Sequence, residues 1–191
     1  MRYIVFDIET QNLFQDVGSR DPVALDLSVI TVYDSGTDKY TTVDISELET
    51  IWPIIEAGDA LVGYNSNHFD IPILNKYYPG DLTQMKSIDL MASIQDSLGK
   101  RLKLDDVASA TVGAKKTANG LIAVKWWREG NIADIKKYCE QDVRVTKQVF
   151  DYAMEHGKIY VKEGTKKREI PIDTTLWKVR EDAPMTHTLM F

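Results

Sequence analysis

The chain has 191 residues, 43% hydrophobic and 27% charged, a composition typical of one globular domain with a full core. Its single cysteine excludes an intrachain disulfide and favours a reducing compartment. Its apolar runs are shorter than the ~20 residues of a membrane-spanning helix. A strand expected from residue 3 leaves no room for a signal peptide. We therefore expect a soluble, cytoplasmic protein.

The net charge of −6 is unusual for a protein that binds nucleic acid, but the average hides local differences. Short basic groups of this kind contact phosphates in some proteins and are only solvated surface in others. The groups are Lys100, Arg101 and Lys103; Lys115 and Lys116; Lys125 and Arg128; Lys136 and Lys137; and Lys166, Lys167 and Arg168.

The first third of the chain predicts mainly strands. Residues 3–9 form an apolar run typical of a buried strand, and a loop is expected from residue 11 to about residue 20. Residues 23–32 and 39–45 are predicted as two more strands, which would form an antiparallel meander with the first. Ser46 and Glu49 match a capping box, which predicts a helix that ends near Gly58.

The rest of the chain is predicted to alternate between strands and helices. We expect strands at 60–64 and 87–90, a helix opening at Asp70, helices near 91–98, 104–112 and 121–128, and a long helix from Asn131 to about Gly157. Residues 158–162 and 168–172 predict a β-hairpin, and the last ten or so residues a tail. This order predicts an α/β fold: a mixed five-stranded sheet flanked by helices over residues 1–157, with residues 158–191 as a hairpin and tail of the same domain.

Three short acidic motifs stand out. The first is FDIET, in which Asp7 and Glu9 lie two residues apart on a predicted strand and therefore point to the same face. Neighbouring carboxylates repel, by on the order of 1 kcal/mol in water at about 4 Å, and a bound cation removes that repulsion. The alternative is that the strand ends at Ile8 and both acids are solvated.

The second motif, NSNHFD, places Asp70 directly after a strand, where it is either a functional acid or simply a helix N-cap. The third, YCEQD, places Tyr138 and Asp142 four residues apart on the long helix, where they share a face. A core tyrosine and a surface acid are the alternative for that pair. Asp89 is expected to be a cap or core-edge residue, and Cys139 a packing residue.

The combination of the three motifs carries more information than any one of them. Four clustered carboxylates need external positive charge, and an all-oxygen ligand set suits Mg²⁺ or Mn²⁺. Two such ions can clamp a phosphodiester during an in-line attack. They would also reduce the net charge from −6 to −2.

With these motifs in this order, the sequence resembles the DEDD superfamily of 3′→5′ exonucleases, which have the ribonuclease H-like fold. The resemblance covers roughly residues 3–155. It is closest to stand-alone predicted exonucleases related to the proofreading domain of family B DNA polymerases, on the strength of residues 121–145. No histidine of this chain lies five residues before an aspartate, whereas Tyr138 lies four before Asp142, so the sequence resembles the tyrosine subclass.

The resemblance implies roles for single residues. It implies that Asp7 bridges two divalent ions, that Glu9 and Asp142 complete the first ion's site, and that Asp70 supports the second. Tyr138 would position the attacking water, and the products would be nucleoside 5′-monophosphates.

The resemblance also implies a nucleic-acid substrate with a free 3′ end, DNA rather than RNA. Candidate substrate-binding residues are Thr10, Leu13, Asn65 and Phe69, with Phe14 as a second apolar wedge beside Leu13. Leu13 packing within its own loop, and Asn65 bracing its loop, stay open as alternatives. The rival functions are a catalytically quiet nucleic-acid-binding or scaffold protein on the same fold, and an endonuclease such as a ribonuclease H.

Overall fold

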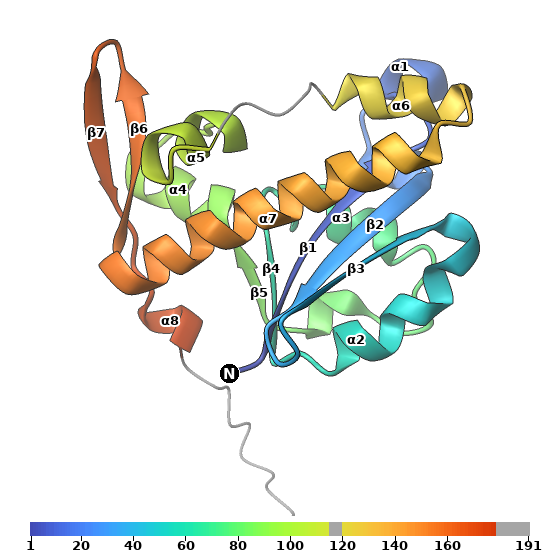
Figure 1. Ribbon diagram of the computed structural model, residues 1–191, viewed down its shortest axis with the longest axis horizontal. Helices are drawn as coiled ribbons and strands as arrows, with labels where there is room; N and C mark the ends of the chain where they lie inside the picture. The colour runs from blue at the N-terminus through green and yellow to red at the C-terminus, as the bar shows by residue number, and fades with distance from the viewer. Residues whose placement is uncertain (115–119, 179–191) are drawn as a thin grey trace, which may run out of the picture.

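The computed structural model describes residues 1–114 and 120–178, and a five-stranded sheet with the strand order β3-β2-β1-β4-β5 forms its centre (Figure 1). The three strands nearest the N-terminus pair antiparallel, and β4 and β5 continue the sheet in parallel with β1. The mixed sheet predicted from the sequence is confirmed. The strands are β1 (Tyr3–Thr10), β2 (Leu27–Asp34), β3 (Lys39–Asp44), β4 (Ala60–Gly63) and β5 (Ser87–Asp89).

Two predictions between β1 and β2 are wrong. The expected loop contains a short helix, α1 (Phe14–Val17), and the strand predicted from Val23 begins only at Leu27. Residues Pro22–Ala24 form a 3₁₀ turn instead, in which the Asp21 carboxylate accepts a hydrogen bond from the Val23 N–H at 3.0 Å. An aspartate followed by a proline favours such a turn, and this local bonding overrides the apolar pattern.

The predicted capping box is also wrong. The N-cap residue is Asp44 and not Ser46. The Asp44 carboxylate accepts a hydrogen bond from the backbone N–H of Ser46 at 3.0 Å. The Ser46 hydroxyl donates to the same carboxylate, so it is not available as a cap. The segment runs as a 3₁₀ helix, η2 (Ile45–Ile51), that continues into α2 (Trp52–Glu56).

The helix that opens at Asp70 is short and ends at Leu74, whereas the helices predicted near 91–98, 104–112 and 121–128 and from Asn131 begin and end close to their predicted bounds. These helices are α3 (Asp70–Leu74), α4 (Leu90–Leu98), α5 (Leu104–Thr111), α6 (Leu121–Arg128) and α7 (Ile132–His156), with a short 3₁₀ turn, η3 (Leu82–Gln84), before β5. In α7, buried residues recur at helical spacing, among them Ile135, Cys139, Val143, Thr146 and Phe150. This stripe lays α7 diagonally across one face of the sheet (Figure 1).

The alternation of side chains along β1 separates the two faces of the sheet. Ile4, Phe6 and Ile8 enter the core formed with η2, α2 and α3. Val5 enters the opposite core, formed with α5, α7 and the hairpin. Asp7 and Glu9 follow Val5 on the strand, so they face α7. The hydrophobic pattern of one strand thus directs both acids toward the helix that carries the third motif.

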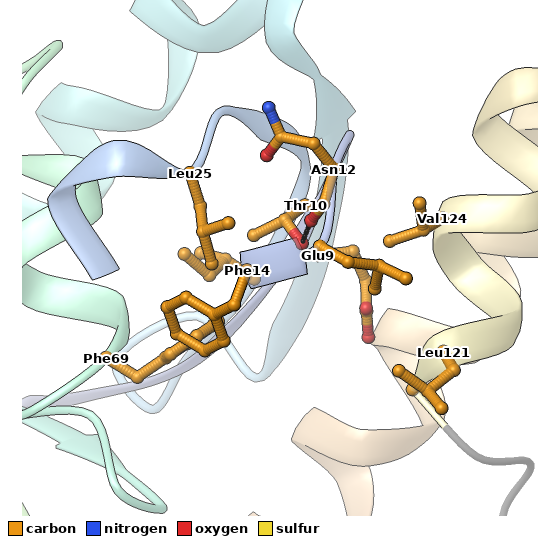
Figure 2. A pocket seen from close by; sticks show the side chains of 11 residues that line it. Glu9, Thr10, Asn12, Phe14, Leu25, Phe69, Leu121 and Val124 are labelled. Atoms are coloured by element: carbon orange, nitrogen blue, oxygen red, sulfur yellow. Dashed lines mark hydrogen bonds between the residues drawn. The ribbon is translucent and has the colours of Figure 1, made fainter. Parts of the chain in front are cut away.

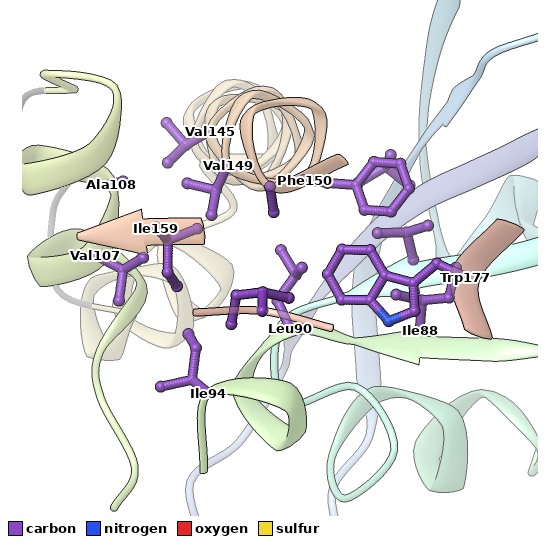
Figure 3. Packing of buried hydrophobic residues seen from close by; sticks show 14 of the residues in the cluster. Ile88, Leu90, Ile94, Val107, Ala108, Val145, Val149, Phe150, Ile159 and Trp177 are labelled. Carbon is purple, nitrogen blue, oxygen red and sulfur yellow. The ribbon is translucent and has the colours of Figure 1, made fainter. Parts of the chain in front are cut away.

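The C-terminal part packs into the same core as the sheet. The hairpin consists of β6 (Lys158–Glu163) and β7 (Lys166–Pro171), and a short helix, α8 (Thr175–Lys178), follows it. Ile159 and Ile170 join the core beside α7, and the Trp177 ring stacks on Phe150 with the centroids 5.4 Å apart (Figure 3). The helix at Thr175 was not predicted. Lys115, Lys116 and the predicted tail, the last ten or so residues, lie outside the described residues.

None of the helices within 1–114 and 120–178 is long and apolar enough to cross a membrane.

Replacing Trp177 by alanine is expected to lower the free energy of unfolding by about 3–5 kcal/mol, because the substitution leaves a cavity beside Phe150. Leu176→Ala is the matched control: Leu176 is 73% exposed, so its loss should cost less than about 0.5 kcal/mol. Urea denaturation of both variants measures the difference. Equal stabilities would show that α8 does not stabilise the domain.

Candidate metal centre and active site

Three carboxylates from two elements meet where α7 crosses β1. Asp7 and Glu9 come from the strand and Asp142 from the helix, and one oxygen from each lies within 4.8 Å of the others. Glu9 is buried, and Asp7 and Asp142 are half-buried. The register between β1 and β2 shifts at Glu9 and Thr10, a bulge of the kind that redirects side chains at functional sites.

Asp70 joins this group from the first turn of α3. It is only 4% exposed, and its Oδ1 atom accepts a hydrogen bond from the Ile8 N–H at 3.2 Å. Phe69 occupies the N-cap position of α3, so Asp70 is not the helix cap that was its alternative interpretation. The backbone bond to Ile8 fixes the Asp70 carboxylate beside the strand that carries Asp7 and Glu9.

Burial and mutual repulsion disfavour the charged forms of these acids. The pKa of Asp7 is raised well above its ordinary range by burial first, and then by the charges of Asp70 and Glu9. Burial likewise raises the pKa of Glu9, with Asp142 as the next cause. Burial raises the pKa of Asp70 to about 7, although the Ile8 N–H partly offsets this effect. A cation among these oxygens would reverse the shifts.

Tyr138 adjoins the carboxylates. Its phenol shares a side-chain hydrogen bond with Asp142, one turn later on α7, and its ring packs against Trp126 at 6.3 Å. Burial, followed by the charges of Asp142 and Glu9, raises the pKa of the Tyr138 phenol well above its ordinary value. The phenol therefore stays protonated at neutral pH and acts as a hydrogen-bond donor.

Cys139 contacts the site in a way that the sequence analysis did not foresee. It is fully buried, as a packing residue should be, but its thiol donates to the backbone oxygen of Asp7 at 3.3 Å and approaches Asp7 Oδ2 at 3.8 Å. The available signal was its spacing, because Cys139 lies three residues before Asp142 and so shares its side of the helix.

An apolar cavity of about 290 Å³ opens directly beside Glu9 (Figure 2). Three of the four predicted substrate-binding residues line it: Thr10, Leu13 and Phe69. The rest of the lining includes Phe14, which packs edge-on to Phe69 at 6.3 Å, and three residues that were not predicted, Asn12, Leu121 and Val124. The last two lie on α6, and only the tertiary packing of that helix brings them to the site.

Asn65 does not line the cavity. It adopts a left-handed backbone conformation, with φ of 65°, and its N–H donates to Asp89 Oδ1 at 2.8 Å. Asp89 also caps α4 by accepting from the Met91 N–H at 2.9 Å, which confirms the cap expected for it. The Asn65 side chain accepts a hydrogen bond from Arg101. These contacts brace the loop that leads to Asp70.

The residues present fit a site for divalent cations. The donors are carboxylate oxygens, the ligand type that Mg²⁺ and Mn²⁺ prefer. Their raised pKa values show that the group is electrostatically unfavourable without added positive charge. Asp7, Glu9 and Asp142 have the spacing of a common ligand set.

The strand order and the carboxylates at the β1–α7 crossing define an α/β domain with an acidic site on its central strand. A model of the RNase H superfamily matches residues 4–154, and the chain therefore belongs to that superfamily. No curated protein matches the sequence.

Among solved structures, the fold is similar to the family B DNA polymerase from the hyperthermophilic archaeon Pyrobaculum calidifontis, with a TM-score of 0.61 and 21% identity. The alignment covers 81% of this chain and 24% of the polymerase, so this chain spans about a quarter of that protein's length. At this identity the likeness establishes the fold. Membership of the RNase H superfamily, together with the carboxylate cluster, supports a nuclease.

The metal-free protein is expected to lose stability as the pH rises from about 4 to about 7. Folded Asp70 keeps its proton up to a pKa of about 7, whereas an unfolded aspartate releases it near 3.9. Between these values the folded state binds more protons, so the free energy of unfolding falls with pH, by about 4 kcal/mol from Asp70 alone. Acids with lowered pKa values, such as Asp34 at about 2, change stability only below this window.

Urea denaturation in EDTA at pH 5 and pH 8 measures this change, and Asp70→Asn should reduce it while the contributions of Asp7 and Glu9 remain. A wild-type protein that is more stable at pH 8 than at pH 5 without metal would contradict the electrostatic description of the site.

Proposed function

We propose that the protein is a metal-dependent 3′→5′ exonuclease of the tyrosine subclass, which acts on single-stranded or frayed nucleic acid. The observation that supports it most is the position of the apolar cavity, which begins at Glu9 of the carboxylate cluster. A terminal base in that cavity would bring its 3′ phosphodiester to the acids. DNA is the proposed substrate, on the resemblance of the motifs alone.

The chain's own residues would divide the chemistry as follows. Asp7, Glu9 and Asp142 would hold one divalent ion, and Asp7 with Asp70 a second. When bound, such ions activate water and stabilise the charge on the leaving 3′ oxygen. Tyr138 donates its phenolic proton to Asp142 or to a water at that edge of the site, and so orients the nucleophile.

The surroundings of the acids support terminal rather than internal cleavage. Phe69 and Leu13 line the cavity together with Leu121, which is 60% exposed. These side chains offer apolar surface to a base that has left the stack. Base–aromatic contacts contribute about 1–3 kcal/mol each, so the pocket would favour an unpaired end.

Asp142→Asn is expected to lower the rate of hydrolysis by more than about 10³-fold. The substitution removes a proposed ligand of a metal ion, and such an ion stabilises the transition state by several kcal/mol. The metal-free variant should fold at least as well as the wild type, since a repelling charge is lost. The assay is a time course with 5′-labelled single-stranded DNA and RNA in Mg²⁺ or Mn²⁺, with EDTA as a blank.

Glu140→Gln, on the same helix but paired with Arg144 at 2.7 Å, is the matched control and should retain activity. A ladder that shortens by one nucleotide at a time supports the exonuclease. Internal cuts would indicate an endonuclease. Binding of the oligonucleotide without cleavage would indicate a catalytically quiet binding protein.

Phe14→Ala is expected to raise KM several-fold with little change in kcat, because Phe14 lines the cavity and would contact a bound base equally before and during the reaction. Val23→Ala is the control, since Val23 is a similarly exposed apolar residue (45%) that does not line the cavity. Steady-state kinetics on a single-stranded oligonucleotide measure both. An unchanged KM for Phe14→Ala would exclude the cavity as the base pocket.

A further inference from the structure

A basic loop adjoins the second acidic motif. Arg101, between α4 and α5, donates a hydrogen bond to Oδ1 of Asn65, which lies five residues before Asp70. The Arg101 side chain is exposed. A guanidinium has five N–H donors, so one bond to Asn65 positions the group and leaves donors for an anion beside the candidate site.

A second cavity, of about 350 Å³, lies between this loop, α5 and β6. Its lining includes Lys100 and Lys162, and Lys162 Nζ lies 3.4 Å from the Ser109 hydroxyl. Asp106 and Glu163 line it too, and Lys100 forms an exposed ion pair with Glu163 at 3.9 Å. An ion pair this long and exposed stabilises little, so another anion can replace the carboxylate as the partner of Lys100.

The hairpin concentrates positive charge in an acidic protein. Residues 158–171 contain five basic and two acidic side chains, a net charge of +3 in a chain of −6. Lys162 and Lys167 lie directly opposite each other in the β6–β7 register, an arrangement in which like charges repel. The acid on the same face, Glu169, accepts a hydrogen bond from Lys158 at 2.8 Å. The exposed pair Lys162 and Lys167 thus forms the cationic end of the hairpin.

The hairpin lies beside the C-terminal end of α7 and next to α5 (Figure 1). Tyr138 and Tyr152 are 14 residues apart, nearly four whole turns, and Tyr152 contacts Tyr160 of β6 with the ring centroids 6.3 Å apart. From Asp142 to Tyr152 the helix rises about 15 Å. Stacked nucleotides rise about 3.4 Å each, so a stacked single strand covers that distance in four or five nucleotides and an extended strand in fewer.

We infer that Arg101, Lys100, Lys162 and Lys167 form a track that binds the phosphates of a single strand on the 5′ side of the scissile bond. Contacts link the parts of this track in sequence. Arg101 bonds Asn65, the neighbouring Lys100 lines the second cavity, and the hairpin strand β6 lines the same cavity. This inference rests on the proposed function, because the candidate site fixes where the 3′ end would lie. The ligand is single-stranded nucleic acid of more than about four nucleotides.

The test compares Lys162→Gln/Lys167→Gln with the wild type and with Lys39→Gln/Lys178→Gln. The control pair changes net charge equally, on exposed positions of β3 and α8. Fluorescence anisotropy in EDTA follows binding of labelled dT20 over a range of salt. Each phosphate contact on a single strand contributes about 0.7 to the magnitude of the slope of log affinity against log salt. The slope of the hairpin variant should therefore be smaller by about 1.4, and the slope of the control variant should be unchanged.

A second readout is the hydrolysis in Mg²⁺ of dT2, whose single phosphodiester would occupy the candidate site, so its rate should be the same in all three proteins. Equal salt slopes in the hairpin variant and the wild type, or no binding of dT20 by the wild type, would overturn the track whatever the chain hydrolyses. A hairpin-dependent slope without hydrolysis of any oligonucleotide by the wild type would support the track and overturn the proposed exonuclease.

Discussion

The structure is organised around the repulsion of four acids where α7 crosses β1. Asp7 and Glu9 are held by a strand that the core encloses on both sides, and Asp70 by a backbone bond to Ile8. None of these three can move away without breaking the packing or that bond. Their raised pKa values are the result. The surrounding core stabilises a cluster that is unfavourable by itself, which is typical of a functional site.

The same crossing connects the site to the rest of the molecule. α7 carries Tyr138, Cys139 and Asp142 at one end, where the thiol bonds the strand at Asp7. At the other end it packs against the hairpin and the stacked rings of Phe150 and Trp177. The hairpin is thereby fixed relative to the acids by one rigid helix. Position along α7 corresponds to position along the proposed path of the strand.

Most of the sheet could be predicted from the sequence because it depends on local periodicity, whereas the meeting of the acids was expected from the resemblance of their motifs to a known family. The alternation in residues 3–9 specifies which face Asp7 takes, and the spacing of Tyr138 and Asp142 specifies their common side. What could not be predicted depends on tertiary contacts or on competing local bonds. Leu121 reaches the cavity only through the packing of α6, and Cys139 meets Asp7 across 132 residues of sequence. Around Pro22 and Asp44, side-chain bonds to the backbone outweighed the apolar pattern.

The most direct test of this account is the stoichiometry of Mn²⁺ binding, measured by titrating the metal-free protein and following free Mn²⁺ by electron paramagnetic resonance. The account predicts two ions per chain for the wild type. It also predicts that Asp7→Asn, which alters the proposed shared ligand, weakens both, while Glu140→Gln changes neither. A wild-type protein that binds no Mn²⁺, or that binds it equally well after Asp7→Asn, would contradict the assignment of the carboxylates to metal.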